Sequence, residues 1–554
     1  NTAIGYAALD ANTTASDNTA VGYASLGANT TGIRNVAVGA TALDANTTGY
    51  DNIGVGVASL GVHTTGYANI AIGSYALDAN TTANHNIGIG RYALSSNTTG
   101  ASNTAIGNDS LAANTTASNN TAVGATALDA NTTGTENVAV GAGALTANTT
   151  GSYNHAFGRN AGAAITTGAT NIAIGNAALS TATTADGNTA IGHNTLAANT
   201  SGASNVAVGA NALDANTSAS NNTAVGYAAL TANTTGAGGT AVGRNSLLAN
   251  TTGAANTGLG HAALAANTTG AGNVAIGNSL SANTTGSYNV SVGHVALNTN
   301  TTADNNTAVG NNSLNANTTG HSNTAVGNSA GDNITTGDSN IIIGSGMDAP
   351  SATADSQLNI GNWIYGSGGN IGFGVTAPSN KFEAYTTTDD QIVASFKNGS
   401  GSATATVVNI ASARGDVLYA LQCFKSNTTE TFRIESTGNA LNTNNSYGAL
   451  SDIKLKENVV DATPKLTDLM GVKVRNYNLI GETTKQIGVI AQELETVFPL
   501  MVDESIDRDT DGVLLETTTK SVKYSVFVPI LVKAIQEQQT LIEALTARIV
   551  TLEG

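Results

Sequence analysis

The sequence predicts a mostly β protein: a parallel β-solenoid followed by a small α+β domain that ends in a long helix. Three observations predict this fold class. A 17-residue repeat fills the first three-fifths of the chain, its fixed positions hold glycine and β-branched residues, and the chain ends in an apolar pattern with helical spacing. The 554 residues include 64 glycines but only 10% charged and 4% aromatic residues. A stacked array is therefore favoured over an ordinary globular core.

The repeat extends from Asn1 to Ser339 as twenty units, with one single-residue deletion in the segment GNSLSANTTG. Position one is Asn in nineteen units, and position five is Gly in all of them. Position two is β-branched in nineteen units and position four is Val or Ile in eighteen, whereas position three is almost always Ala or Gly. Because alternate residues of a strand point to the same side, each unit is predicted to hold one short strand with a bulky face and a bare face.

Each unit is predicted to form one coil of the solenoid. A strand of five residues needs a neighbour on each side, and the segment ANTTG supplies residues that let the chain reverse. We expect Val or Ile at position four and Leu at position nine to fill a thin core. Asn at positions one and twelve should form ladders of side-chain amides. At about 4.8 Å per coil, the shaft would be on the order of 95 Å long.

Position ten is predicted to face solvent. Asp10, Asp44 and Asp78 occupy this position in alternate early units, and Gly27 and Gly61 stand between them. Like charges therefore do not stack on neighbouring coils, where repulsion would be strongest. The alternative is that these carboxylates hydrolyse a sugar, but they have no recurring second carboxylate as a partner.

Composition argues against several other functions. The net charge of −17 disfavours electrostatic binding of nucleic acid or of anionic membranes, and no apolar run approaches the roughly 18 residues of a membrane span. The single Cys423 allows no intrachain disulfide, as expected for folding in a reducing cytoplasm. The seven histidines lack metal-ligand spacing, so no metal or other cofactor is expected. Tyrosines such as Tyr6, Tyr23 and Tyr227 are too sparse along the sequence for an evident sugar-stacking row.

The repeat pattern ends near residue 345, and three further regions are predicted. Residues 346–380 include Trp363 and several glycines and would form a cap or neck; their segment GSGGNIGFG is read as turn-rich β structure, because no strand-then-helix context for phosphate binding surrounds it. Residues 381–450 contain short alternating runs, which predict a small β region. Residues 451–554 form the last domain, with a terminal helix over 524–553.

The segment SDIKLKEN at the start of the last domain holds a candidate catalytic pair. Ser451 and Lys456 are five residues apart, and a lysine that is desolvated enough to lose its proton can accept the proton of a serine hydroxyl. The alternative is that Ser451 and Asp452 only begin a helix as its cap.

Three blocks of this domain carry a family resemblance. SDIKLKENV, IGVIAQELETVFPLMV and VKYSVFVPILVKAIQEQQTLIEALTARIVTLEG closely resemble, in order and spacing, the C-terminal intramolecular chaperone domain of phage endosialidases and tail fibres, which also occurs in myelin regulatory factors. The resemblance implies a domain that trimerises, directs folding and then cleaves itself off once. It implies Ser451 as nucleophile, Lys456 as base and Leu450–Ser451 as the cleaved bond. Many members have Arg where Lys454 stands here.

The expected association is a homotrimer. Units such as NVAVGA and NIAIGN are similar to the head repeats of trimeric autotransporter adhesins, and longer units are similar to repeats of phage tail fibres. The terminal helix carries a seam with alternating four- and three-residue steps, which is typical of a coiled coil. Ile and Leu in this seam favour two strands, so the expectation of three rests on the resemblance. The seam residues are Leu531, Ile535, Gln538, Ile542, Leu545, Ile549 and Leu552.

Two functions follow from these expectations. The first is a structural and adhesive tail fibre of a phage virion, assembled in the host cytoplasm, that binds a glycan or outer-membrane component of the host and undergoes single-turnover serine proteolysis. The alternative is a bacterial surface adhesin or extracellular filament that uses the same chaperone. An enzyme that acts on host polysaccharide is disfavoured.

Overall fold

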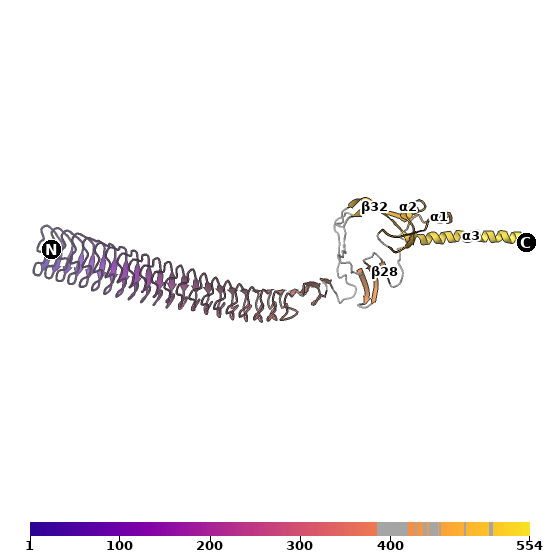
Figure 1. The fold of residues 1–554 in the computed structure, drawn as a ribbon. Helices are drawn as coiled ribbons and strands as arrows, with labels where there is room; N and C mark the ends of the chain where they lie inside the picture. The colour runs from indigo at the N-terminus through magenta and orange to yellow at the C-terminus, as the bar shows by residue number, and fades with distance from the viewer. Residues whose placement is uncertain are drawn as a thin grey trace. The chain divides into compact units, whose positions relative to one another are not determined.

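The structure is a computed structural model that describes residues 1–379, 381–384, 419–426, 429–435, 440–442, 453, 456–480, 483–508 and 514–554. The chain divides into two compact units, Asn1–Lys397 and Asn398–Gly554. Figure 1 shows the first unit as a succession of stacked coils.

Each coil of the first unit contributes one three-residue strand to a long parallel ladder. The strands of this ladder are β1 (Thr2–Ile4), β2 (Thr19–Val21), β3 (Val36–Val38), β4 (Ile53–Val55), β5 (Ile70–Ile72), β6 (Ile87–Ile89), β7 (Thr104–Ile106), β8 (Thr121–Val123), β9 (Val138–Val140), β10 (His155–Phe157), β11 (Ile172–Ile174), β12 (Thr189–Ile191), β13 (Val206–Val208), β14 (Thr223–Val225), β15 (Thr240–Val242), β16 (Thr257–Leu259), β17 (Val274–Ile276), β18 (Val290–Val292), β19 (Thr307–Val309), β20 (Thr324–Val326), β21 (Ile341–Ile343) and β22 (Leu358–Ile360).

The register of this ladder follows the repeat. Thr2 pairs with Thr19, and each later strand pairs in parallel with the equivalent residues of the next coil. At the single-residue deletion the step is one residue shorter, so that Val274 pairs with Val290. The predicted solenoid with one strand per unit is confirmed, and it has about 21 coils.

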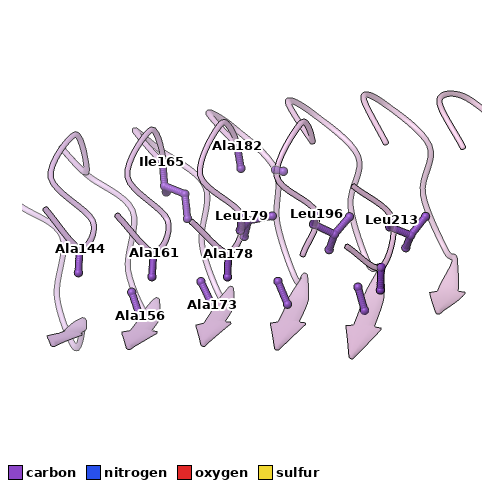
Figure 2. Packing of buried hydrophobic residues seen from close by; sticks show 14 of the residues in the cluster. Ala144, Ala156, Ala161, Ile165, Ala173, Ala178, Leu179, Ala182, Leu196 and Leu213 are labelled. Carbon is purple, nitrogen blue, oxygen red and sulfur yellow. The ribbon is translucent and has the colours of Figure 1, made fainter. Parts of the chain in front are cut away.

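The core of the solenoid differs from the prediction. Position three is inside: Ala20 and Ala37 are fully buried, together with Leu26 and Leu43 at position nine. Figure 2 shows the alanines and leucines of successive coils in repeated rows. The expected core role of position four is wrong, because this position lies on the outer side, and Val38 is 36% exposed.

The tightness of the coil explains this reversal. At Gly88, one of the few glycines at position three, an added Cβ would lie 3.2 Å from both the Ala93 carbonyl oxygen and Leu77 Cγ. In most coils little room is left beyond a Cβ between the strand and the turn; the larger Ile342 is accommodated beside Gly331, which lacks a side chain. The bare face of the strand is therefore the inner one, and the β-branched face is the outer one.

The two asparagine ladders are confirmed. At position one, the backbone N–H of Asn35 donates to Asn18 Oδ1 over 2.9 Å, and Asn35 Nδ2 donates to the Gly49 carbonyl over 2.8 Å. At position twelve, Asn46 Nδ2 donates to Asn29 Oδ1 over 2.8 Å. These side chains are buried, so the contacts from coil to coil supply the hydrogen bonds that a buried amide requires.

The ladder at position twelve is interrupted where another residue replaces asparagine. The side-chain oxygens of Asn46, Asn148 and Asn317 are buried without a hydrogen-bond partner. The coils that follow them carry His63, Ile165 and Ile334 at position twelve. Each of these acceptors therefore precedes a coil that lacks the amide donor.

Two of the interruptions are coupled to a change at position nine. Ile165 and Ile334 occur in coils that have Gly162 and Gly331 instead of leucine at position nine. A Cβ at Gly162 would lie 2.9 Å from Leu145 Cδ2 and 3.0 Å from Ile165 Cδ1. The isoleucine thus fills the core space that leucine fills in the other coils (Figure 2).

The aspartates at position ten are only partly solvent-facing. Asp10 is exposed, but Asp44 and Asp78 are half-buried, which corrects the prediction for these two residues. A Cβ at Gly27 would lie 2.7 Å from Asp44 Oδ1, so the missing side chain leaves room for the carboxylate of the next coil. Burial raises the pKa of Asp78. The alternation with glycine therefore provides space as well as separating the charges.

His63 interrupts the inner polar ladder, and replacing it with asparagine should stabilise the shaft. The ring is fully buried, with Nε2 2.9 Å from the Gly66 carbonyl oxygen and Nδ1 3.3 Å from the Asn80 carbonyl oxygen. A neutral imidazole has one N–H and can donate to only one of them. His63→Asn would also give Asn46 Oδ1 a donor. We expect a stability gain of about 1 kcal/mol, measured as a higher thermal midpoint.

The same variant should reduce the sensitivity of the shaft to acid. Burial lowers the pKa of His63 in the folded chain, so the unfolded chain binds more protons once the pH falls below about 6.5. The wild type should lose stability from that pH downward, whereas His63→Asn should not lose this contribution. The exposed His261 serves as control. Equal midpoint shifts for His63→Asn and His261→Asn between pH 7.5 and pH 5 would contradict the assignment.

The C-terminal end of the ladder is closed by antiparallel strands. β23 (Ile364–Ser367) pairs antiparallel with β22, and β24 (Asn370–Phe373) pairs antiparallel with β23. Gly368 and Gly369, both with positive φ, form the two-residue turn between them. β25 (Phe382–Ala384) then pairs in parallel with β24. The segment GSGGNIGFG is thus turn and strand, as predicted.

In its described residues, the second unit contains three small antiparallel sheets and a long helix. Its elements are β26 (Tyr419–Ser426), β27 (Thr429–Glu435), β28 (Ala440–Asn442), α1 (Leu466–Met470), β29 (Arg475–Tyr477), β30 (Gln486–Gly488), α2 (Ala491–Glu495), the 3₁₀ turn η2 (Pro499–Met501), β31 (Val502–Arg508), β32 (Leu514–Val522), the 3₁₀ turn η3 (Tyr524–Val526) and α3 (Phe527–Glu553). The terminal helix is therefore α-helical from Phe527, and residues 524–526 form a tighter turn before it.

Candidate self-cleavage site and helical assembly surface

The segment IGVIAQELETVFPLMV builds the core of the C-terminal unit. Leu494, Phe498 and Met501 are buried, and Phe527 and Ile530 at the start of α3 pack against them. The carbonyl of Leu494 accepts the backbone N–H groups of Val497 and Phe498, which ends α2 in a tight turn. Pro499 then begins η2, where its missing N–H costs no hydrogen bond. The segment therefore anchors the beginning of α3.

Ion pairs tie the sheets of this unit to α2. Arg475 of β29 donates to both carboxylate oxygens of Glu493, over 2.7 and 2.9 Å, and this bond lowers the pKa of Glu493. Lys520 of β32 contacts Glu495 at 2.5 Å. These pairs are largely exposed, so each one contributes little stability by itself. Their main effect is to orient α2 between the two sheets.

Glu537 connects α3 to the segment that follows the candidate catalytic residues. Its carboxylate accepts the backbone N–H of Lys465 over 2.9 Å and that of Leu466 over 2.9 Å, at the beginning of α1. The bond from Leu466 is the main cause that lowers the pKa of Glu537. A carboxylate from another helix thus caps α1, which has no side-chain cap of its own. Any partner that fixes α3 would also fix the chain nine residues after Lys456.

The predicted catalytic residues are only partly within the described chain. Lys456 is exposed, and its backbone N–H donates to the Ile453 carbonyl over 3.1 Å. Leu450, Ser451 and Lys454 lie outside the described residues. The pairing of Ser451 with Lys456 and the cut at Leu450–Ser451 stay predictions.

The helix α3 presents an uncovered apolar stripe in the described single chain. Sequence reasoning identified this seam, and the structure places all seven of its residues at the surface. The exposed residues are Leu531, Ile535, Gln538, Ile542, Leu545, Ile549 and Leu552. A stripe of this size on a helix with only one end packed is typical of a helix that associates with other helices. None of the helices in the described ranges has the length and apolar character needed to cross a membrane.

One segment of this C-terminal unit matches a known family. Residues 451–503 match the family model described as the chaperone of endosialidase. The matched endosialidase-type chaperone segment starts at Ser451, includes Lys456 and extends through α1, the β29–β30 hairpin, α2 and η2. The expected resemblance of the C-terminal blocks is thereby confirmed for this segment. No curated protein and no solved structure matches the chain.

The chaperone segment ends before α3. The contacts described above join this segment to α3. Sequence reasoning identified the seam of α3 but missed Glu537, whose role depends on backbone groups far away in the sequence. Arg475 was also missed, although an arginine before a Glu-rich helix is a weak signal for an ion pair. Within the described ranges, no group of three or more His, Cys, Asp or Glu side chains could hold a metal ion.

Proposed function

We propose that the protein is a homotrimeric structural and adhesive fibre of a phage virion, of the tail-fibre type. In this proposal the C-terminal domain directs trimerisation and folding and then cleaves itself off. One observation carries it: a single chain joins a solenoid shaft with an uncovered β-branched face to an endosialidase-type chaperone segment. The fibre would be assembled in the host cytoplasm and would bind a glycan or outer-membrane component of the host.

The outer face of the shaft supports association between copies. Positions two and four place two side chains per coil on one flat surface, and Ile72 and Phe157 are 39% and 42% exposed there. About 21 coils at about 4.8 Å give a stripe roughly 100 Å long and about 7 Å wide. This is on the order of 700 Å² per chain, close to the roughly 800 Å² that each partner buries in a stable complex.

The helix seam supports a common starting point for the chains. Nearly identical coils can pair in a wrong register at little cost, since each strand resembles its neighbours. A coiled coil formed by α3 would align the chains once and remove this ambiguity. The exposed side chains of Ile535, Ile542 and Ile549 would be buried in such a coiled coil.

Association also supports the self-cleavage part of the proposal. Lys456 must lose its proton to act as a base, and burial of a lysine favours the neutral form. Its side chain is exposed in the single chain. The contact of Glu537 with the start of α1 couples this segment to α3, so packing between copies would provide the missing desolvation. The reaction is a single turnover of a serine peptidase and uses no cofactor.

The second candidate is a bacterial surface adhesin or extracellular filament with the same chaperone. The observation that favours it is the similarity of NVAVGA and NIAIGN to the head repeats of trimeric autotransporter adhesins. Both candidates share the trimer, the shaft and the removable C-terminal domain. The location of the mature fibre, on phage particles or on bacterial cells, separates them and can be determined with an antibody against the shaft.

The trimer is tested by the solution mass of the full chain. We expect light scattering of the Ser451→Ala chain, which should not be cut, to give three times the chain mass of 55.0 kDa. Ile542→Asp should prevent association, because it places a charge in the middle of the seam. Thr540→Asp, at an exposed site of α3 outside the seam, should leave the mass unchanged. A wild-type monomer would contradict the proposal.

A further inference from the structure

An apolar groove lies beside the first turns of α3 in the C-terminal unit. Its volume is about 430 Å³, and residues of α1, the β29–β30 hairpin, η3 and α3 line it. The lining carries no charged side chain. It includes Leu469, Val474, Ile487, Tyr524, Phe527 and Leu531. Ile487 is 72% exposed, so a partner that covers the groove would remove apolar surface from water.

The groove is already formed in the single chain. Val489 donates its backbone N–H to the Tyr524 hydroxyl over 3.3 Å, which holds the tyrosine at the groove wall. The ring of Phe527 lies beside it, with centroids 6.2 Å apart. Leu469 and Phe527 also pack against the buried core of this unit. A surface that is fixed in advance loses little conformational entropy when a partner covers it.

The groove continues the seam of α3 on one flank of the helix. The alternating steps of the seam place Ile535 at position a and Leu531 at position d of a heptad. Phe527 then falls at position g, directly beside the seam. Leu531 belongs to the seam and also lines the groove. A helix that covers the seam at this level therefore reaches the groove as well.

The other flank of α3 presents two exposed valines. Val528 stands one heptad before Ile535, and Val532 is at position e. They are 62% and 51% exposed, and neither lines the groove. The flanking positions of coiled coils often carry glutamate or lysine. Here α3 instead has an apolar groove on its g flank and apolar side chains on its e flank.

We propose that the groove of one copy receives Val528 and Val532 from α3 of the next copy. In a parallel coiled coil the g flank of one helix faces the e flank of its neighbour. Val532 of the next copy would therefore meet Phe527 at the groove. The groove and the valines are both uncharged, so their contact buries no unpaired charge.

The width of the apolar face favours a second copy as the occupant. Leu541, also at position g, is 61% exposed, so apolar residues extend beyond positions a and d on both flanks of the seam. A face of this width is covered when the helix has a neighbour on each side, as in a ring of three copies. Each copy would give its valines to one neighbour and receive those of the other. The inference rests on the proposed trimer and adds the chaperone segment to its interface.

Photo-cross-linking of the full-length Ser451→Ala chain identifies the occupant. The photo-reactive residue p-benzoylphenylalanine, placed at the exposed position of Ile487, links to whatever lies in the groove. We expect covalent species of two and three chains on a denaturing gel, with linked peptides from residues 528–536. The control carries the same probe in place of Ile506, an exposed residue of β31 outside the groove. It should give no link to these peptides.

The variant Val532→Asp tests the contact without a probe. It would bury a carboxylate in an apolar groove, so association should weaken about tenfold or more. The measurement is the mass over a dilution series of the Ser451→Ala chain. Thr546→Asp is the matched control, because Thr546 is exposed at position e two heptads later and does not face the groove level. It should associate like its parent chain.

Several results would overturn the groove contact and leave the proposed trimer intact. They are links to peptides of the shaft or of another protein, links only within one chain, or a Val532→Asp trimer as stable as that of Thr546→Asp. Covalent species that stop at two chains would support the groove contact and refute the number of three. A monomeric Ser451→Ala chain would refute both the proposed assembly and the groove contact.

Discussion

Replacing Ser451 with alanine is expected to leave the chain intact at 554 residues, whereas the wild type is expected to separate at the Leu450–Ser451 bond. The Ser451 hydroxyl would attack the carbonyl carbon of Leu450 while Lys456 accepts its proton. The bond from this carbon to the Ser451 nitrogen would break as Lys456 returns the proton to that nitrogen, and water would then hydrolyse the resulting ester. Lys456→Ala should also block the cut. Lys454→Ala should only slow it, because Lys454 matches the family position where many members have arginine.

The cut should depend on folding and association. The reaction requires Lys456 to lose its proton, which burial favours, and its side chain is exposed in the single chain; folding and association would have to bury it. Denatured chains should therefore not be cut, and the Ile542→Asp variant should be cut slowly or not at all. The measurement is a denaturing gel with N-terminal sequencing of the small fragment. A Ser451→Ala protein that is still cut before residue 451 would end the hypothesis.

Gly175→Val is expected to abolish soluble assembled protein. Gly175 has a φ of +134°, which side chains rarely adopt, and an added Cβ would lie 2.3 Å from the Gly192 carbonyl oxygen and 2.6 Å from its carbon. The clash is with backbone of the next coil, so no rotamer change relieves it. Strain and clash together should cost about 3 kcal/mol or more. Soluble trimer yield after expression is the measurement.

Asp214→Ala is the matched control for Gly175→Val. Position ten already accepts Asp, Gly, Ser, Thr and Ala in different coils. Burial raises the pKa of Asp214, so the folded state binds protons more readily than the unfolded state, and this group destabilises the fold above its unfolded pKa. Its removal should leave stability at pH 7 equal or slightly higher. Equal yields for the two variants would refute the packing of the glycine row.

The candidate site could be proposed from the sequence because its signals are local. Ser451 and Lys456 stand five residues apart in a segment whose residues carry a family match, and the seam of α3 has a regular spacing that the helix preserves. Glu537 was not predictable, since it acts on backbone N–H groups of Lys465 and Leu466, about seventy residues earlier in the chain. Backbone groups carry no residue-specific signal in a sequence.

The sequence by itself determined the coil, its register and its inner amide ladders. A period of 17 residues with Asn at positions one and twelve leaves few alternatives, because stacked identical amides satisfy one another only when each coil follows the last in register. The tertiary structure decided which strand face is inside. Alternation assigns positions two and four to one side, but only the packing across the closed coil, where a Cβ at Gly88 already meets Ala93 and Leu77, shows that this side is the outer one. It also decided that Tyr23 has Tyr6 as a neighbour and that Ile165 replaces a leucine, because stacking turns a separation of 17 residues into direct contact.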